Sequence, residues 1–461
     1  MGLASARLRV HNLRVTPREL AEKICRVLAA AGHQAYLVGG CVRDIVLGRE
    51  PADYDVSTDA TPDRVEALFP GSLTVGAKFG VVIVVEGSAQ VEVATFRSDL
   101  GYADGRHPDA VVYSRSAADD VRRRDFTING LLLDPRSGAV IDLVGGRADL
   151  DARRVRAIGE PDRRFAEDKL RLIRAVRFAA RFGFEIEPAT FAAIGRHAAE
   201  IVQVSPERLR DELSRLLTEG ASRRGFELLH SAGLLAPALP EVARLEGVPQ
   251  PPEFHPEGDV WIHTRLMLEN LPADASATLG WGVLLHDIGK PPTFTPPTAP
   301  GGRIRFDNHA EIGAVMAEAI CRRLRFSLAA TGQIVALVRQ HLRFIDVPRM
   351  RPATLKRFVR LPGFAEHLEL HRLDCQASHG KLDTYEFLVR FLAETPAQEI
   401  RPPRLVTGDD LIALGLRPGP AFGAILRGVE EAQLEGQVSS REEALALASS
   451  LAKGSAAKDT K

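Results

Sequence analysis

Two aspartates separated by one residue are the strongest chemical signal in the sequence. Asp53 and Asp55 are followed by a valine, and residues two apart in an extended strand point to the same face. Their carboxylates can therefore share a Mg²⁺ ion, which prefers oxygen ligands. An apolar run ending at Val38 predicts a short buried strand, and Gly39 and Gly40 form a turn whose backbone a phosphate could approach closely. Each signal alone also suits an ordinary turn or loop, but their order and spacing together favour a metal and phosphate site.

The elements that must position these residues follow from the hydrophobic periodicity. An amphipathic helix is predicted over 17–32, before the strand, and a short helix over 41–47, after the glycines. Two β-rich runs, 81–85 and 91–96, are separated by EGSAQ and predict a hairpin. Glu92 lies in the second run and could supply a third carboxylate near the aspartates, although a glutamate in a strand is often simply exposed to solvent.

The rest of the chain is predicted to be mostly helical. Residues 167–184 have the pattern of one long arginine-rich helix that ends at Gly183. The glycine-rich and charged segment 98–110 has no periodicity and predicts a mobile loop. The Pro-rich segment 248–259 predicts a linker, and the last ten residues, 452–461, predict a disordered tail.

Composition limits the class of protein. The 461 residues suffice for two to four domains, and Lys+Arg and Asp+Glu balance at 60 each. Residues 121–181 nevertheless hold fifteen Arg or Lys against nine Asp or Glu, which favours a contact with RNA or a triphosphate. The four cysteines form no CxxC pair, which argues against a disulfide framework or a zinc ribbon. No window approaches the length of a membrane span, so we expect a soluble cytoplasmic protein without a membrane partner.

Four ordered motifs identify a family resemblance. GGCVRD, the Asp53-x-Asp55 pair, RRDFTING and EDKLRLIRAVRF stand in the order found in bacterial class II tRNA nucleotidyltransferases and poly(A) polymerases, which belong to the polymerase β superfamily. The chain departs from the family at Gly130, where alanine is usual. The resemblance implies an α+β fold with four parts: a small polymerase β-like nucleotidyltransferase head over 1–158, a helical neck and body for nucleobase and tRNA binding over 159–250, an all-α HD domain over 251–380, and a helical tail domain with a disordered C-terminus over 381–461.

The resemblance also implies an activity and a set of site residues. Relatives of this kind add C, C and A to the 3′ end of tRNA without a template, using CTP, ATP and two Mg²⁺ ions. The implied catalytic carboxylates are Asp53 and Asp55, which would bind Mg²⁺, with Glu92 as a third. The implied nucleotide-binding residues are Gly39, Gly40, Arg43, Arg124, Asp168, Arg171, Arg174 and Arg177.

Two of these residues are expected to select the base. Asp168 and Arg171 are three apart, which places them side by side on a helix. A carboxylate accepts from the exocyclic amino group of cytosine or adenine, and a guanidinium donates to the neighbouring ring nitrogen. Guanine and uracil would instead direct an oxygen acceptor at Asp168. By helix geometry Arg177 points away from Asp168 and could be structural.

A second resemblance, to HD phosphohydrolases, covers the histidine-rich region. Imidazole and carboxylate ligands suit a transition metal, and the implied activity is hydrolysis of a phosphomonoester or a 2′,3′-cyclic phosphate at an active or a purely structural site. The implied metal ligands are His263, His286, Asp287, His309, His341 and Asp374.

Two alternatives to CCA addition remain at the level of sequence. One is an A-adding enzyme or poly(A) polymerase of the same family, whereas a CC-only enzyme is disfavoured because such relatives lack the flexible loop that 98–110 would supply. The other is an HD phosphohydrolase whose head only binds RNA, although a binding module would not need paired carboxylates. Oligomeric state is left open.

Overall fold

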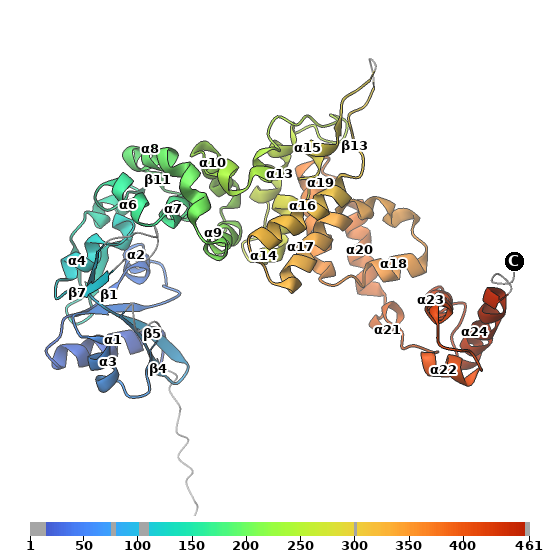
Figure 1. Cartoon of the computed structure of the whole chain (residues 1–461), viewed down its shortest axis with the longest axis horizontal. Helices are drawn as coiled ribbons and strands as arrows, with labels where there is room; N and C mark the ends of the chain where they lie inside the picture. Colours follow the sequence, from blue (N-terminus) through green and yellow to red (C-terminus); the bar gives the residue numbers. More distant parts are fainter. Residues whose placement is uncertain (1–14, 75–79, 101–109, 299–301, 457–461) are drawn as a thin grey trace, which may run out of the picture. The chain divides into compact units, whose positions relative to one another are not determined.

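The computed structural model describes residues 15–74, 80–100, 110–298 and 302–456 (Figure 1). The chain forms two compact units, Met1–Ala243 and Arg244–Lys461, and each is described by itself. The first unit combines a β-sheet with helices, and the second is almost entirely helical. Both agree with the expected α+β head followed by helical domains. Among the described residues no helix has the length and apolar character needed to span a membrane.

The sheet of the first unit has seven strands in the order β3-β4-β5-β2-β1-β8-β9. The neighbours β2 and β5 are parallel, and the remaining pairs are antiparallel. The antiparallel pair β4 and β5 confirms the hairpin predicted around EGSAQ. The strands are β1 Ala35–Val38, β2 Asp55–Thr58, β3 Leu73–Thr74, β4 Val81–Glu86, β5 Ala89–Thr95, β8 Leu131–Asp134 and β9 Ala139–Asp142.

Helix α1, Pro17–Ala30, packs against the sheet as its amphipathic pattern predicts. Its N-terminus is fixed by a capping box, in which Thr16 and Glu19 bond each other's backbone N–H groups. Leu20, Ile24 and Leu28 are fully buried on the side that faces the strands. Burial of side chains of this size contributes about 1.5–3 kcal/mol each, so the helix is held mainly by this face.

The helix predicted over 167–184 is present as α7, but it begins at Leu170, later than predicted. Helix α6 covers Pro161–Glu167, Asp168 is extended, and α7 covers Leu170–Phe182. The Asp168 carboxylate accepts a hydrogen bond from the backbone N–H of Leu170, 3.0 Å away, and this local bond replaces helix continuation. Gly183 ends α7 in the left-handed conformation, as predicted.

The other helices of the first unit surround the sheet or continue from it (Figure 1). They are α2 Gly40–Val46, α3 Pro62–Leu68, α4 Ala117–Arg122, η2 Thr127–Asn129, α5 Gly146–Asp151, α8 Pro188–His197, η3 Ala198–Gln203, α9 Pro206–Thr218, α10 Ser222–Ser231, α11 Leu235–Ala238 and α12 Pro240–Ala243. Small two-stranded sheets join β6 Arg97–Leu100 with β7 Ala110–Tyr113, and β10 Arg154–Val155 with β11 Glu185–Ile186. The ends of the loop predicted over 98–110 are therefore strands, and its residues 101–109 lie outside the described residues.

The second unit is built from helices around separate apolar cores. Helix α20 packs against α19 and η4 through the buried Leu388, and a distinct core begins at Leu405. By this packing, the helical tail domain begins after α20, whereas the predicted boundary was residue 381. The elements are α13 Val260–Glu269, α14 Ala277–Leu285, α15 Lys290–Thr293, β12 Phe294–Thr295, β13 Arg305–Phe306, α16 His309–Arg323, α17 Leu328–Gln340, η4 His341–Arg349, α18 Pro352–Phe358, α19 Phe364–Ala377, α20 Asp383–Glu394, α21 Ala397–Ile400, α22 Gly408–Ala413, α23 Pro420–Leu434 and α24 Arg441–Ala456.

Two predictions about the second unit need correction. Helix α24 includes residues 452–456, so the predicted disordered tail overlaps a helix, and residues 457–461 lie outside the described part. The predicted linker 248–259 is tied down by side chains. Asp259 caps α13 by accepting from Ile262, and the buried Gln250 accepts from Lys290 at 2.6 Å.

Candidate active site and metal centre

An arginine-rich cavity of about 510 Å³ lies in the first unit. It is lined by all eight residues expected to bind the nucleotide and by Asp55. Asp53 and Glu92 are not part of the lining. The further lining residues are Arg123, Asp125, Asn129, Leu170, Phe178, Arg181, Arg208, Arg215 and Glu219.

The carboxylates of Asp55 and Glu92 come from neighbouring parallel strands. Asp55 is the first residue of β2 and pairs in register with Glu92 on β5. Asp53 is exposed and precedes the strand, so only one of the two aspartates belongs to it, contrary to the expected strand pair. Burial and the negative charges of Glu92 and Asp53 raise the pKa of Asp55 to about 6, although Arg124 opposes this shift. Uncompensated negative charge of this kind fits a bound cation.

The glycine turn between β1 and α2 brings backbone close to the cavity. Gly39 has φ +72° and ψ −128°, a conformation that residues with a Cβ rarely adopt. A Cβ on Gly39 would lie 3.1 Å from an Nη1 atom of Arg124. Glycine at this position therefore meets a conformational need and lets the arginine approach the backbone.

Two cavity arginines are held in place by polar partners. Arg43 is buried, donates to Asp44 at 2.8 Å and to Asn129 at 2.7 Å, and lies over the ring of Phe182. Arg124 donates to the Ser57 hydroxyl and to the carboxylate of Asp120. Bidentate guanidinium groups fixed in this way suit the binding of phosphate.

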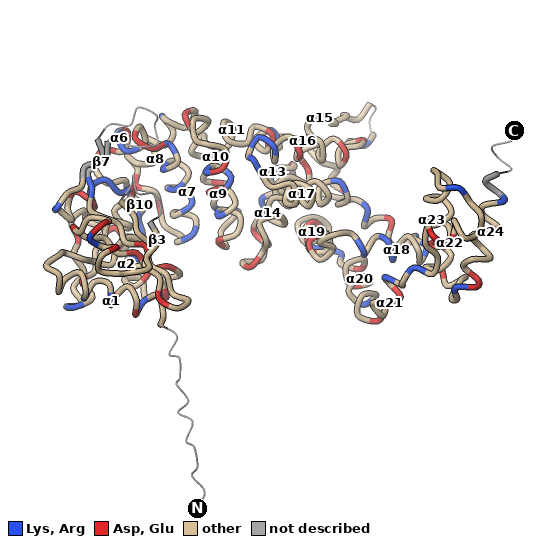
Figure 2. The backbone as a smooth tube through the Cα atoms, turned by 60° about the horizontal axis from the view of Figure 1, so that its bottom comes forward, with Lys and Arg blue, Asp and Glu red and all other residues tan. Residues whose placement is uncertain are grey.

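Two of the cavity arginines on helix α7, Arg174 and Arg177, have partners that were not predicted. Arg174 donates twice to Asp125, at 2.7 and 3.0 Å. Burial would raise the pKa of Asp125, but Arg174 and Asn129 outweigh it and lower that pKa to about 2. Arg177 is buried and donates to Glu212 of α9 at 2.6 Å and to Glu219 at 3.1 Å. Figure 2 shows basic and acidic residues along α7 and α9.

Asp168 and Arg171 line the same cavity but do not share a helix face, because α7 begins at Leu170. Arg208 of α9 holds both carboxylate oxygens of Asp168, at 2.7 and 3.1 Å. Arg171 donates to Glu167 at 2.8 Å and to the backbone carbonyl of Arg123. The carboxylate and the guanidinium are thus each fixed by other partners.

A second group of polar side chains is buried in the second unit. The structure brings all six expected HD residues together, from α13, the end of α14, the start of α16, the start of η4, and α19. His309 Nε2 lies 3.3 Å from His341 Nε2, and these atoms lie 3.5 and 3.8 Å from Asp287 Oδ1. His263 Nε2 lies 3.2 Å from Asp374 Oδ1.

The chemistry of this group fits a metal ion. Within the described chain, buried atoms without hydrogen-bond geometry to any partner include His263 Nε2, His286 Nε2 and both carboxylate oxygens of Asp287. Burial lowers the pKa of His341 to about 4, so this imidazole offers a lone pair. In the described part of the chain, every set of three potential ligand atoms within 4.8 Å of one another lies in this region. Among the described residues, the carboxylates of the first unit form no such set.

Two residues of this region were missed because they lie in the supposed linker. Glu257 Oε1 accepts from Nδ1 of His263 at 2.7 Å and from Nδ1 of His255 at 2.8 Å. Burial would lower the pKa of His263, but Asp374 and Glu257 outweigh it and raise that pKa to about 9. The only sequence signal was the presence of these two residue types shortly before the first HD histidine.

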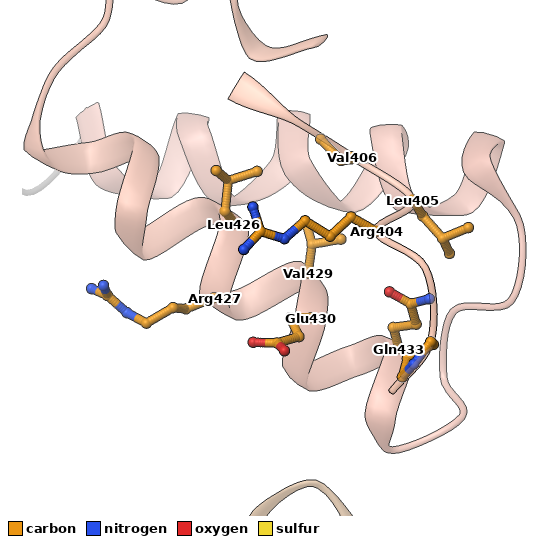
Figure 3. Close-up of a pocket in the computed structure, with 9 residues that line it drawn as sticks. Arg404, Leu405, Val406, Leu426, Arg427, Val429, Glu430 and Gln433 are labelled. Carbon is orange, nitrogen blue, oxygen red and sulfur yellow. The ribbon is translucent and has the colours of Figure 1, made fainter. Parts of the chain in front are cut away.

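A smaller cavity, of about 140 Å³, lies among the C-terminal helices (Figure 3). No predicted site residue lines it. Glu430 pairs with Arg360, and the Gln433 amide donates to the carbonyl of Pro403. Its lining residues are Pro402, Arg404, Leu405, Val406, Leu426, Arg427, Val429, Glu430 and Gln433.

Comparison with family models assigns three regions. Residues 35–156 match the poly A polymerase head domain, residues 183–245 match the probable RNA and SrmB-binding site of polymerase A, and residues 259–369 match the HD domain. The three matches follow one another in the order of the predicted head, body and HD regions.

Comparison with known proteins points the same way. The chain is 44% identical over 216 residues to a CCA-adding enzyme of Levilactobacillus brevis, a match spanning 47% of this chain and 54% of that enzyme. It is 33% identical to a CCA-adding enzyme of Lacticaseibacillus paracasei over 90% of this chain and 91% of that enzyme. The crystal structure of the Bacillus stearothermophilus CCA-adding enzyme in complex with CTP is similar, with TM-score 0.72 and 27% identity over 96% of this chain and 99% of that one.

Proposed function

The chain belongs to the CCA-adding enzyme family, and we propose that it adds C, C and A to the 3′ end of tRNA, using CTP and ATP. The observation that carries this proposal is that all eight expected nucleotide-binding residues line one arginine-rich cavity of the first unit. A triphosphate carries several negative charges, and fixed guanidinium groups bind such charge with good geometry.

The carboxylates beside this cavity are the proposed catalytic groups. Asp53, Asp55 and Glu92 would hold Mg²⁺, which when bound supplies charge for the α-phosphate and the leaving pyrophosphate and activates the 3′-hydroxyl of the tRNA. Arg43 and Arg124 orient the triphosphate against the glycine turn. This orientation places the α-phosphate for attack by the hydroxyl, with pyrophosphate as the leaving group.

Asp168 and Arg171 are proposed to select the base. The carboxylate accepts from the exocyclic amino group of cytosine or adenine, and the guanidinium donates to the adjacent ring nitrogen. Support comes from their shared cavity and from the bidentate contact with Arg208, which keeps the Asp168 carboxylate oriented. Guanine and uracil place an acceptor against this carboxylate and are rejected.

The test offers tRNAs that end before CCA, after C and after CC, with CTP and ATP, and sequences the products. We expect completion of CCA on all three. Addition of A only to the tRNA ending in CC indicates an A-adding enzyme, and long A tails indicate a poly(A) polymerase.

A variant checks that this chemistry depends on the head carboxylates. In Asp53→Ala with Asp55→Ala, addition is expected to stop while tRNA affinity stays nearly unchanged, because phosphate contacts by basic residues dominate that affinity. Substantial turnover by this variant in Mg²⁺ would contradict the assignment. A wild-type chain that adds no nucleotide but hydrolyses phosphate esters would favour a phosphohydrolase with an RNA-binding head.

A second activity is favoured by the imidazoles of the HD region that converge on the carboxylate of Asp287. We propose that these six residues hold a transition metal, which when bound polarises a phosphate ester and activates water. The expected substrates are phosphomonoesters and 2′,3′-cyclic phosphates. Hydrolysis of 2′,3′-cyclic AMP and of p-nitrophenyl phosphate, with Mn²⁺, Co²⁺ or Ni²⁺, tests this proposal.

A further inference from the structure

We propose that Glu257 positions His263 as a metal ligand of the HD region and strengthens its bond to the metal. This inference rests on the proposed metal site and concerns a residue outside the six expected ligands. It follows from how the four imidazoles of the site are held.

Three of these imidazoles are anchored by backbone carbonyls. The Nδ1 atom of His286 lies 2.8 Å from the carbonyl oxygen of Val283, three residues earlier. His309 and His341 repeat this contact with the carbonyls three residues before them, at 2.8 and 2.6 Å. A carbonyl only accepts, so each Nδ1 carries a proton, and in the neutral ring the lone pair is then on Nε2, where a metal can bind.

His263 departs from this pattern. Its Nδ1 atom lies 2.7 Å from Oε1 of Glu257, so a side-chain carboxylate takes the place that a backbone carbonyl has in the other three. The ring is fully buried, and its Nε2 atom lies 3.2 Å from Asp374, on the side of the metal ligands. The Nδ1 atom of His263 therefore faces the outer carboxylate of Glu257, and its Nε2 atom faces the proposed metal site.

The outer carboxylate is itself held in position. His255 donates from Nδ1 to the same oxygen of Glu257 at 2.8 Å, and its ring packs edge-on against His263, with centroids 5.0 Å apart. Helix α13 begins just after this segment, where Asp259 bonds both Ile262 and the backbone N–H of Gly247. The segment 255–259 therefore holds Glu257 in place against His263, the first HD histidine.

Geometry argues that Glu257 supports the ligand from behind. It contacts Nδ1 of His263 at 2.7 Å, the distance of an N–H···O hydrogen bond, whereas the other ring nitrogen, Nε2, lies beside Asp374 and the remaining HD ligands. An imidazole whose Nδ1–H donates to a carboxylate is oriented in one tautomer and is a more basic ligand at Nε2. Loss of such a partner typically weakens metal binding by about 10–100-fold.

The test measures Co²⁺ affinity of the full chain by calorimetry and by the visible absorption of bound Co²⁺. Four variants are compared with the wild type: Glu257→Ala, Glu257→Gln, Glu253→Gln, and His286→Ala combined with Asp287→Ala. We expect Glu257→Ala to raise the Kd about 10–100-fold, and Glu257→Gln to raise it less, because an amide oxygen still accepts from Nδ1. Glu253 is exposed in the same segment, so its variant should keep the wild-type Kd.

The outcomes separate the two proposals. If wild type binds Co²⁺, the double variant does not, and both Glu257 variants keep the wild-type Kd, the positioning role is wrong and the metal site stands. If wild type and double variant are indistinguishable, the metal site fails, and the inference fails with it. Should Glu257→Ala unfold, the Kd of Glu257→Gln decides, and an unchanged value overturns the inference.

Discussion

Asp168 makes two structural contacts in addition to its proposed contact with the base. Its carboxylate accepts from the N–H of Leu170 at the start of α7, and it is held by the fork of Arg208. These contacts use both oxygens but leave lone pairs available, because each carboxylate oxygen can accept more than one bond. A substitution at this residue must therefore keep the hydrogen bond that caps the start of α7, from the N–H of Leu170, while it removes the negative charge.

Asp168→Asn meets that requirement, because asparagine caps helices about as well as aspartate. The amide can donate to uracil O4 or guanine O6, so we expect use of CTP and ATP to fall by about 10–100-fold and relative misincorporation of UTP and GTP to rise. Single-nucleotide addition with each of the four triphosphates measures this change. Asp162→Asn, in an exposed ion pair with Arg196, is the matched control. Unchanged selectivity in folded Asp168→Asn would leave only a structural role for Asp168.

Gly130 stands where the family resemblance leads us to expect alanine, and its surroundings are closely packed. A Cβ at this position would lie 2.7 Å from Cγ2 of Val144 and 3.2 Å from Cδ1 of Ile158. Gly130→Ala is expected to destabilise the chain by about 1–3 kcal/mol through overpacking. Calorimetry of the full chain measures this effect, and Val144→Ala in the same chain should recover part of it. An additive loss in the double variant would contradict the packing explanation.

At the scale of elements, α7 and α9 form the wall that carries most of the cavity arginines. Arg177 is only 3% exposed and lies between Glu212 and Glu219, while Arg174 contacts Asp125 at 2.7 Å and Glu212 at 3.4 Å. Helix geometry had left open whether Arg177 is structural or belongs to the nucleotide site. In the structure it is held by ion pairs and also lines the cavity.

Glu212→Gln is expected to destabilise the chain by about 3 kcal/mol. The buried guanidinium of Arg177 would keep only one of its two carboxylate partners, Glu219. Asp211, next to Glu212, is exposed and pairs with Arg210, so Asp211→Asn should change stability by no more than about 0.5 kcal/mol. Calorimetric melting of both variants makes the comparison. Equal, small shifts in the two variants would show that Arg177 does not depend on Glu212.

The elements also show what can be predicted from the sequence. The strand, glycine turn, helix and hairpin of the head depend on local patterns, and the structure confirms them. The break at Asp168 was missed because a single side-chain bond to Leu170 outweighs a strongly helical periodicity. Glu257 and Arg208 were missed for another reason: they act through partners six and forty residues away, and no spacing rule marks them.

At the scale of the whole molecule, two sites with different ligand chemistry lie in different compact units. The first offers carboxylate oxygens beside arginines, a set that suits Mg²⁺ with a bound triphosphate. The second offers four imidazoles and two carboxylates, which suit a transition metal. The two proposed reactions therefore depend on different residues and different metals.

We expect the two chemistries to separate when either site is removed. His286→Ala with Asp287→Ala should abolish metal-dependent phosphate ester hydrolysis and spare nucleotide addition, because Asp287 contacts three HD imidazoles and none of the cavity residues. Asp53→Ala with Asp55→Ala should have the opposite effect.

The same separation is expected from metal removal: after chelation, Mg²⁺ should restore addition, whereas Mn²⁺, Co²⁺ or Ni²⁺ should be needed for hydrolysis. Both activities are assayed on one preparation of each variant, with its melting curve. Loss of both activities in the His286 and Asp287 variant, with an unchanged melting curve, would show that the sites are not independent.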